Sequence, residues 1–178
     1  MTPPPRPARL LALAAVLAGL PVLAGCDTTN PGGNVALVEG TYTLAELSFD
    51  PSTTDLSTAN VARSLDLAAT RLDIFGGGGN TLLLVQRLDG TRRRIDLRTR
   101  ASRERVTFEA LTREDEAFLA GLLLPPTFTL GYTGERPNVL EASLRLTGVD
   151  LQAFDPERYQ DQRSNSGQLS IRFERAGS

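Results

Sequence analysis

Short runs of alternating apolar and polar residues follow one another from residue 40 to residue 175. A period of two is the pattern of strands that bury one face. About eight such runs can be counted, and about eight strands is the number at which a small antiparallel barrel closes around its own side chains or one small ligand. The pattern therefore predicts an all-β protein, an antiparallel up-and-down barrel of about eight strands. The apolar positions run over residues 42–49, 65–74, 82–88, 95–97, 106–110, 128–132, 140–146 and 169–173.

Three local signals refine this prediction. The alternation slips in phase between Leu44 and Leu47, which indicates a β-bulge. The pair Asp89-Gly90 favours a hairpin with a two-residue turn. Residues 112–123 instead place apolar side chains at helical spacing after Thr112, a residue type that caps helix N-termini. We therefore expect one short helix near residues 112–123.

The N-terminal segment has a different pattern. Arg6 and Arg9 precede an almost wholly apolar stretch over residues 10–24. That stretch is too short to cross a hydrocarbon core of about 30 Å as a helix. A basic start followed by such a stretch is typical of a secretory signal peptide. Residues 1–25 are therefore expected to be a cleaved signal peptide.

The apolar stretch ends in the run Leu23-Ala24-Gly25-Cys26, which contains the only cysteine of the chain. This run resembles the lipobox of bacterial lipoproteins. The resemblance implies signal-peptide cleavage between Gly25 and Cys26, with Cys26 as the lipid attachment residue. The acyl chains on Cys26 would bind a membrane, which is therefore the expected partner. More than one chain is needed for this anchoring to be stable. An ordinary signal peptide cut at another position is the alternative.

A lipid anchor would place the protein in the bacterial cell envelope, with its domain in the periplasm or at the cell surface. Asp27 resembles the inner-membrane retention signal of enteric bacteria, but that rule does not transfer between phyla, and we favour the outer membrane over the inner one. Residues 26–39 are expected to form the lipidated N-terminus and a flexible tether, because the first part is polar and rich in turn formers. Residues 40–176 would then form a single barrel-like domain.

Composition narrows the possible chemistry. The chain has no histidine and no lysine, so the commonest general base and metal ligand is missing. A single cysteine allows neither an intramolecular disulfide nor a cysteine–zinc site. A net charge of −2 does not suit a general nucleic-acid binder. We therefore expect no catalytic residue, no cofactor, no metal site and no nucleic-acid partner.

Arginines gather between residues 92 and 105. Guanidinium groups bind phosphates and sulfates through two parallel hydrogen bonds, so arginines on one strand face form a candidate anion-binding patch. The alternative, which we favour, is a solvated strand face whose charges pair across strands with acids such as Glu109. The four arginines that alternate along one run are Arg92, Arg94, Arg98 and Arg100.

The first and last predicted strands carry a further likeness. Gly40-Thr41-Tyr42 opens the first strand, and Leu169, Ile171 and Phe173 mark the last. Together with the number of strands, these features resemble bacterial lipocalin-like lipoproteins, although tyrosine stands where lipocalins usually have tryptophan. The resemblance implies an up-and-down barrel that holds a small apolar molecule.

Three functions stay open. The first is a non-enzymatic, membrane-anchored envelope lipoprotein that binds a small hydrophobic ligand or lipid inside the barrel. The second is a structural or assembly lipoprotein that contacts another envelope protein through its outer surface. The third is a carboxylate-based hydrolase. An open apolar cavity would favour the first function, and a filled interior would count against it.

Overall fold

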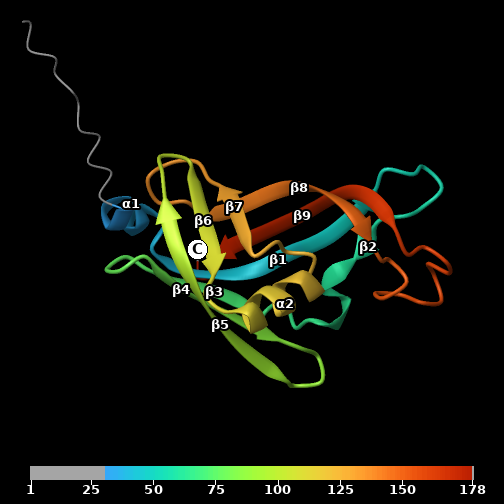
Figure 1. Cartoon of the computed structure of the whole chain (residues 1–178). Helices are drawn as coiled ribbons and strands as arrows, with labels where there is room; N and C mark the ends of the chain where they lie inside the picture. Colours follow the sequence, from blue (N-terminus) through green and yellow to red (C-terminus); the bar gives the residue numbers. More distant parts are fainter. Residues whose placement is uncertain (1–30, 178) are drawn as a thin grey trace, which may run out of the picture.

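A computed structural model of the chain describes residues 31–177 and shows a closed antiparallel barrel (Figure 1). Eight strands pair in the order β1-β3-β4-β5-β6-β7-β8-β9, and β9 pairs back with β1. The two-residue strand β2 pairs with the far end of β1, outside this ring. The predicted all-β, up-and-down architecture is confirmed. In chain order the elements are α1 (Pro31–Val38), β1 (Gly40–Pro51), β2 (Ala59–Asn60), η1 (Val61–Ser64), β3 (Arg71–Phe75), β4 (Asn80–Gln86), β5 (Arg92–Ala101), β6 (Arg105–Ala110), α2 (Arg113–Gly121), β7 (Thr127–Gly131), β8 (Val139–Val149) and β9 (Asn165–Arg175).

Two of the local signals are confirmed. The register of β1 against β9 shifts between Leu44 and Glu46, at the predicted bulge. Helix α2 begins after Thr112, whose hydroxyl oxygen accepts a hydrogen bond from the backbone N–H of Asp115 at 3.2 Å. This bond satisfies one of the free N–H groups that every helix exposes at its start.

The predicted two-residue turn between β4 and β5 is wrong. The Gly90 N–H donates to the Arg87 carbonyl at 3.0 Å, and the Arg87 N–H donates to the Thr91 carbonyl at 2.9 Å. Gly90 alone in this turn has a positive φ, of 85°. This is the three-residue loop with a left-handed third residue. The Asp89 carboxylate accepts hydrogen bonds from the Thr91 hydroxyl and backbone N–H, which lower its pKa below the ordinary value.

The tether predicted for residues 26–39 does not extend over all of them. Residues 31–38 form α1, and the side chains of Val35 and Val38 are 0% exposed. The two valines recur at a spacing that places them on one face of a helix, and burying that face against the barrel stabilises the helix. None of the helices within residues 31–177 is both long and apolar enough to cross a membrane.

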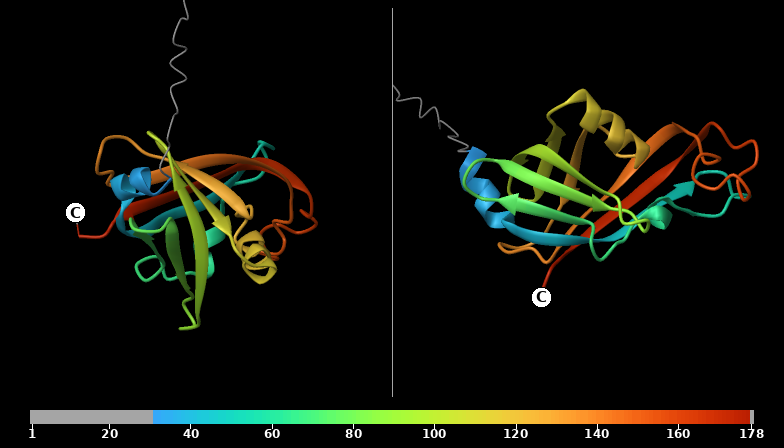
Figure 2. Two further views of the ribbon diagram at one scale, coloured as in Figure 1. Left: turned by 60° about the vertical axis from the view of Figure 1, so that its left-hand side comes forward. Right: turned by 90° about the horizontal axis from the view of Figure 1, so that it is seen from below.

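Helix α1 lies at one end of the barrel, while η1, the end of α2 and residues 150–164 lie toward the other (Figures 1 and 2). Inward-facing side chains of the strands form the core between these ends. The largest of them are buried completely because alternate strand positions point into the barrel. They include Tyr42, Phe49, Phe108, Phe173, Leu72, Leu83, Ile95, Leu97, Leu130 and Leu140.

Tyr42 and Arg175 hold the α1 end of the barrel together. The Arg175 Nη2 donates to the Tyr42 hydroxyl at 2.6 Å, and the guanidinium carbon lies 4.8 Å from the ring centroid. Arg175 also donates to the carbonyls of Glu39 and Pro137, each at 3.0 Å. The Tyr42 hydroxyl donates to the Val38 carbonyl at 3.0 Å. Burial raises the pKa of Tyr42, and the nearby Arg175 partly opposes that rise.

We expect Arg175→Lys to lower the free energy of unfolding by about 1–3 kcal/mol, because an ammonium group cannot reproduce the planar fork that reaches three partners and stacks on the ring. Urea unfolding followed by circular dichroism measures this change. Arg172→Lys is the matched control, since Arg172 is exposed and its one ion pair within residues 31–177 is with Glu174 at 3.0 Å. Equal stability of the two variants would contradict the structural role of Arg175.

Candidate functional site

The barrel wall is nearly open between β7 and β8. Strand β8 pairs with β9 from Val139 to Val149, but its pairing with β7 is limited to Gly131 and Glu141. Pro125 and Pro126 come directly before β7. Proline has no N–H to donate to a ladder, so β7 does not extend backward along the second half of β8. We call this gap the seam.

The seam leaves apolar side chains of β8 without a covering strand. Leu140 is fully buried, but Ala142, Leu144 and Leu146 on the same face are only partly buried. They pack against the core on one side and meet the gap on the other. Apolar surface that stays in contact with water in this way is favourable to cover.

A cleft of about 510 Å³ lies at the end of the seam, between the α2–β7 connection and the end of β8. We call it the seam cleft. Most of its wall is apolar, and Asp150 is the charged residue that lines it. Its volume falls in the range of about 300–1,000 Å³ that is usual for small-molecule sites. Its apolar side chains are Leu123, Leu124, Pro125, Leu146, Val149 and Phe154.

Leu123 enters this cleft from a strained turn. It has a φ of 60°, and the Leu124 N–H donates to the Leu119 carbonyl at 2.9 Å, the bond of a helix end in which glycine usually takes the left-handed position. A leucine in that conformation costs about 1–2 kcal/mol. The turn places Leu123 on the cleft wall while Leu122 and Leu124 are buried.

A second cleft, of about 430 Å³, adjoins the first. It lies between η1, the β4–β5 hairpin and the end of α2, and we call it the arginine cleft because Arg63 and Arg87 line it. Gly121, Ala153 and Phe154 line both clefts. Phe154 therefore stands between an apolar space and a basic one.

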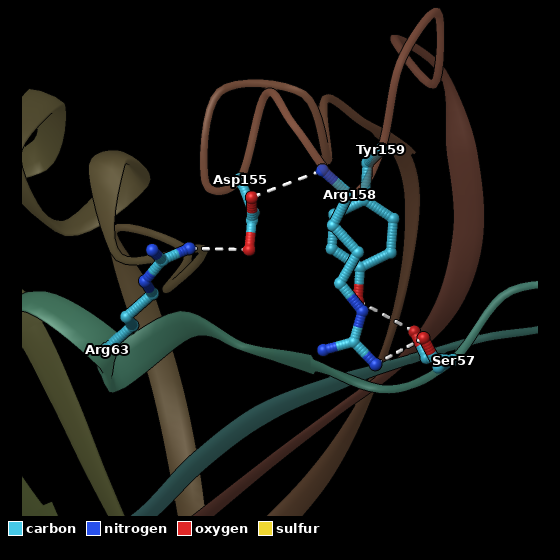
Figure 3. A network of polar contacts seen from close by, with 5 residues as sticks. All are labelled: Ser57, Arg63, Asp155, Arg158 and Tyr159. Atoms are coloured by element: carbon cyan, nitrogen blue, oxygen red, sulfur yellow. Dashed lines mark hydrogen bonds and ion pairs between the residues drawn. The ribbon is translucent and has the colours of Figure 1, made fainter.

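The wall that carries Phe154 is fixed by polar contacts to the segment around η1 (Figure 3). The Asp155 carboxylate pairs with Arg63 and accepts from the Arg158 N–H at 3.2 Å. The buried Tyr159 donates to the Ser57 carbonyl at 2.8 Å, and Arg158 donates to the Ser57 hydroxyl. Residues 150–164, which have no strand pattern, are thus held in place by side chains.

The interior of the barrel is filled. Its cavity of about 10 Å³ lies among inward side chains such as Leu83, Val85 and Phe173 and is too small for more than about one water molecule. Leu122 and Leu124 close it from the α2 end. This part of the interior offers little room for a ligand, because aromatic and branched side chains occupy it. A ligand inside the barrel stays a prediction.

A third cleft, of about 450 Å³, contains two carboxylates, Glu104 and Glu141, beside Tyr132. Burial and Glu104 raise the pKa of Tyr132. A hydrolytic pair needs one carboxylic acid kept protonated, usually by burial, and both glutamates are exposed. This cleft gives no support to the hydrolase alternative. Within residues 31–177 no group of three or more acidic or cysteine side chains is arranged to hold a metal ion.

The structure places the predicted arginine patch on the outward face of β5. Arg94 pairs with Asp96 at 3.1 Å. Arg98 and Arg100 lie 3.4 and 3.9 Å from Glu109 on β6. Arg92 donates to the side chain of Gln86 at 2.7 Å. These pairings match the alternative of a solvated strand face, and anion binding by the patch stays a prediction. Gly25 and Cys26 lie outside the described residues.

Comparison with solved structures returns matches of low similarity. A lipocalin-like protein from Bacteroides uniformis ATCC 8492 matches over 78% of this chain and 98% of its own, at 13% identity and a TM-score of 0.39. An uncharacterized protein from Bacteroides eggerthii DSM 20697 matches over 74% and 97%, at 7% identity and a TM-score of 0.37. No family model and no curated protein matches the chain. The fold assignment therefore rests on the strand pairing itself.

The sequence pattern did not indicate the residues that form the two clefts. Leu123, Leu146 and Phe154 come from three separate connections, and no local motif joins them. Two signals were present. Residues 149–166 form the longest stretch without strand pattern, and long connections in compact domains often carry function. The two prolines before β7 also indicated that this strand has to be short.

Proposed function

We propose that the protein is a non-enzymatic binding protein that holds a small hydrophobic ligand in the seam cleft and is anchored to a bacterial envelope membrane through Cys26. The observation that carries the ligand site is the contrast between the filled interior, with about 10 Å³, and the seam cleft, with about 510 Å³. Shielding the apolar cleft wall from water contributes about 25 cal/mol for each Å² covered.

The wall of the seam cleft is suited to hold a ligand in one place. Phe154 is fixed on a loop that is tied to Ser57 and Arg63. Leu146 pairs with Gly167 of β9, directly before the register shift in β8. A site whose side chains are already ordered loses less conformational entropy when a ligand binds. Leu123 has a left-handed conformation that glycine would adopt more easily. A leucine at this position supports a role for its side chain in the cleft rather than in the turn.

The proposed anchor also sets an orientation. Helix α1 begins at Pro31, so four residues lie between it and Cys26, and the five residue steps reach no more than about 18 Å. The α1 end of the barrel would then face the membrane. The elements that line the two clefts lie toward the opposite end (Figure 2). The clefts would therefore open to the aqueous side, where a ligand can be passed to or from another molecule.

An assembly role through the outer surface is the second candidate. Two observations support it. Leu88 is 70% exposed at the tip of the β4–β5 hairpin, and the cavity among the inward side chains measures about 10 Å³. Single exposed leucines are common on protein surfaces, so the seam cleft favours the ligand function. Retention of an envelope protein that depends on Leu88, with no ligand in the cleft, would favour the second candidate.

We expect a neutral alkyl probe, a dodecanol carrying a photoreactive diazirine, to label the seam cleft of the processed protein in lipid nanodiscs. Leu146→Asn should raise the half-saturating probe concentration about tenfold, because it removes one apolar wall of the cleft. Labelled peptides are identified by mass spectrometry. Leu88→Asn makes the same change outside the cleft and should label like the wild type. Unaltered labelling of the Leu146 variant would place the ligand elsewhere.

Cys26→Ser should abolish acylation and leave the protein as unprocessed precursor or as a product that is not membrane-bound, because serine lacks the thiol that accepts the lipid. Metabolic labelling with a fatty-acid analogue, followed by membrane fractionation, measures both effects. Incorporation of the label at the wild-type level in this variant would refute the anchor.

A further inference from the structure

The two clefts adjoin and share part of their wall. The apolar seam cleft and the arginine cleft share Gly121, Ala153 and Phe154 as lining residues. A molecule long enough to extend from the seam cleft past Phe154 would contact both clefts. A basic space and an apolar space thus lie side by side, which suits a ligand that has both a charged and an apolar part.

The charges that line the arginine cleft are both positive. Arg87 is exposed and forms no ion pair or side-chain hydrogen bond within residues 31–177, and its charge acts on Asp89 at the exposed hairpin tip, where it helps to lower that pKa. Arg63 pairs with Asp155 through one nitrogen, Nη1. A guanidinium group has five N–H donors, so Arg63 keeps donors for a second anion.

The charge that lines the seam cleft is negative. Of the residues that line it, Asp150 is the one with a charge, and Asp150 does not line the arginine cleft. A negative head group is repelled beside Asp150 and attracted most strongly beside Arg87, because Asp155 offsets part of the charge of Arg63. The charges thus favour a single orientation for an anionic amphiphile.

We propose that the ligand is an alkyl chain with an acidic head group, a carboxylate or a phosphate monoester. The chain lies in the seam cleft, and the head group accepts hydrogen bonds from Arg87 and from the remaining N–H donors of Arg63. The proposal rests on the proposed function for the place of the chain and adds the chemistry and position of the head group. Charge-assisted hydrogen bonds of this kind are among the stronger ones in proteins.

The test compares three diazirine probes with the same alkyl chain on the processed protein in nanodiscs: dodecanol, dodecanoate and dodecyl phosphate. At about pH 8, where both acids are ionised, we expect at least one acid to half-saturate the seam cleft at about one tenth of the dodecanol concentration. The tighter acid identifies the head group. Because lipid partitioning differs between the probes, each ratio is compared between variants in the same nanodiscs.

Arg87→Gln should abolish the preference for the acid and leave dodecanol labelling unchanged. Arg92→Gln is the matched control, because it removes a positive charge from the same hairpin outside the cleft, and it should keep the preference. An acid preference that survives in Arg87→Gln, or equal labelling by acid and alcohol in the wild type, would overturn this inference and leave the proposed function standing. Absence of labelling of the cleft by all three probes would overturn both.

Discussion

Uneven backbone pairing around the barrel is the constraint on which the rest of the structure depends. Strand β9 pairs with β1 from Arg175 to Gly167 and with β8 along most of its length, so the sheet closes firmly on that side. Between β7 and β8 the closure is one residue pair. The two prolines before β7 supply no N–H groups that could extend the strand backward along β8, and residues 127–130 pair with β6 rather than with β8. The same feature creates the cleft and leaves the fold intact.

Packing explains why the ligand site is expected beside the barrel rather than inside it. Eight strands enclose a space just wide enough to be filled by side chains, and this chain points large ones inward, among them Tyr42, Phe49, Phe108 and Phe173. Opening the interior would require truncating several of them, at about 3–5 kcal/mol for each buried aromatic. The seam offers apolar surface without that cost, because no strand covers it.

The fold could be predicted from the sequence to a large extent, and the clefts could not. Period-two alternation depends on neighbouring residues, and so do the Thr112 cap and the bulge near Leu44, which is why all three were recognised. The prediction of a two-residue turn at Asp89-Gly90 was wrong because the side-chain hydrogen bonds of Asp89 to Thr91 favour a three-residue loop. Helix α1 was missed because its buried valines depend on contacts with the barrel.

The clefts could not be predicted from a sequence pattern, because they depend on contacts between residues far apart in the chain. Arg63 and Arg87 are neighbours only because residue 65 bridges to Arg87, and Phe154 reaches both clefts only because its loop is tied to Ser57. The run of arginines on β5 is conspicuous in the sequence, yet three of the four lie within ion-pair distance of acids. Arg87, which lines the arginine cleft and forms no ion pair within residues 31–177, stands outside that run.

The most direct test of the account is where the alkyl chain lies. Methyl NMR of the leucine-labelled protein, with an isotope-labelled dodecyl ligand bound, reports contacts through intermolecular nuclear Overhauser effects. The account predicts contacts from the ligand to the methyl groups of Leu123 and Leu146, and none to Leu83 or Leu72 in the interior. Contacts to the interior leucines without contacts to Leu123 and Leu146 would contradict it.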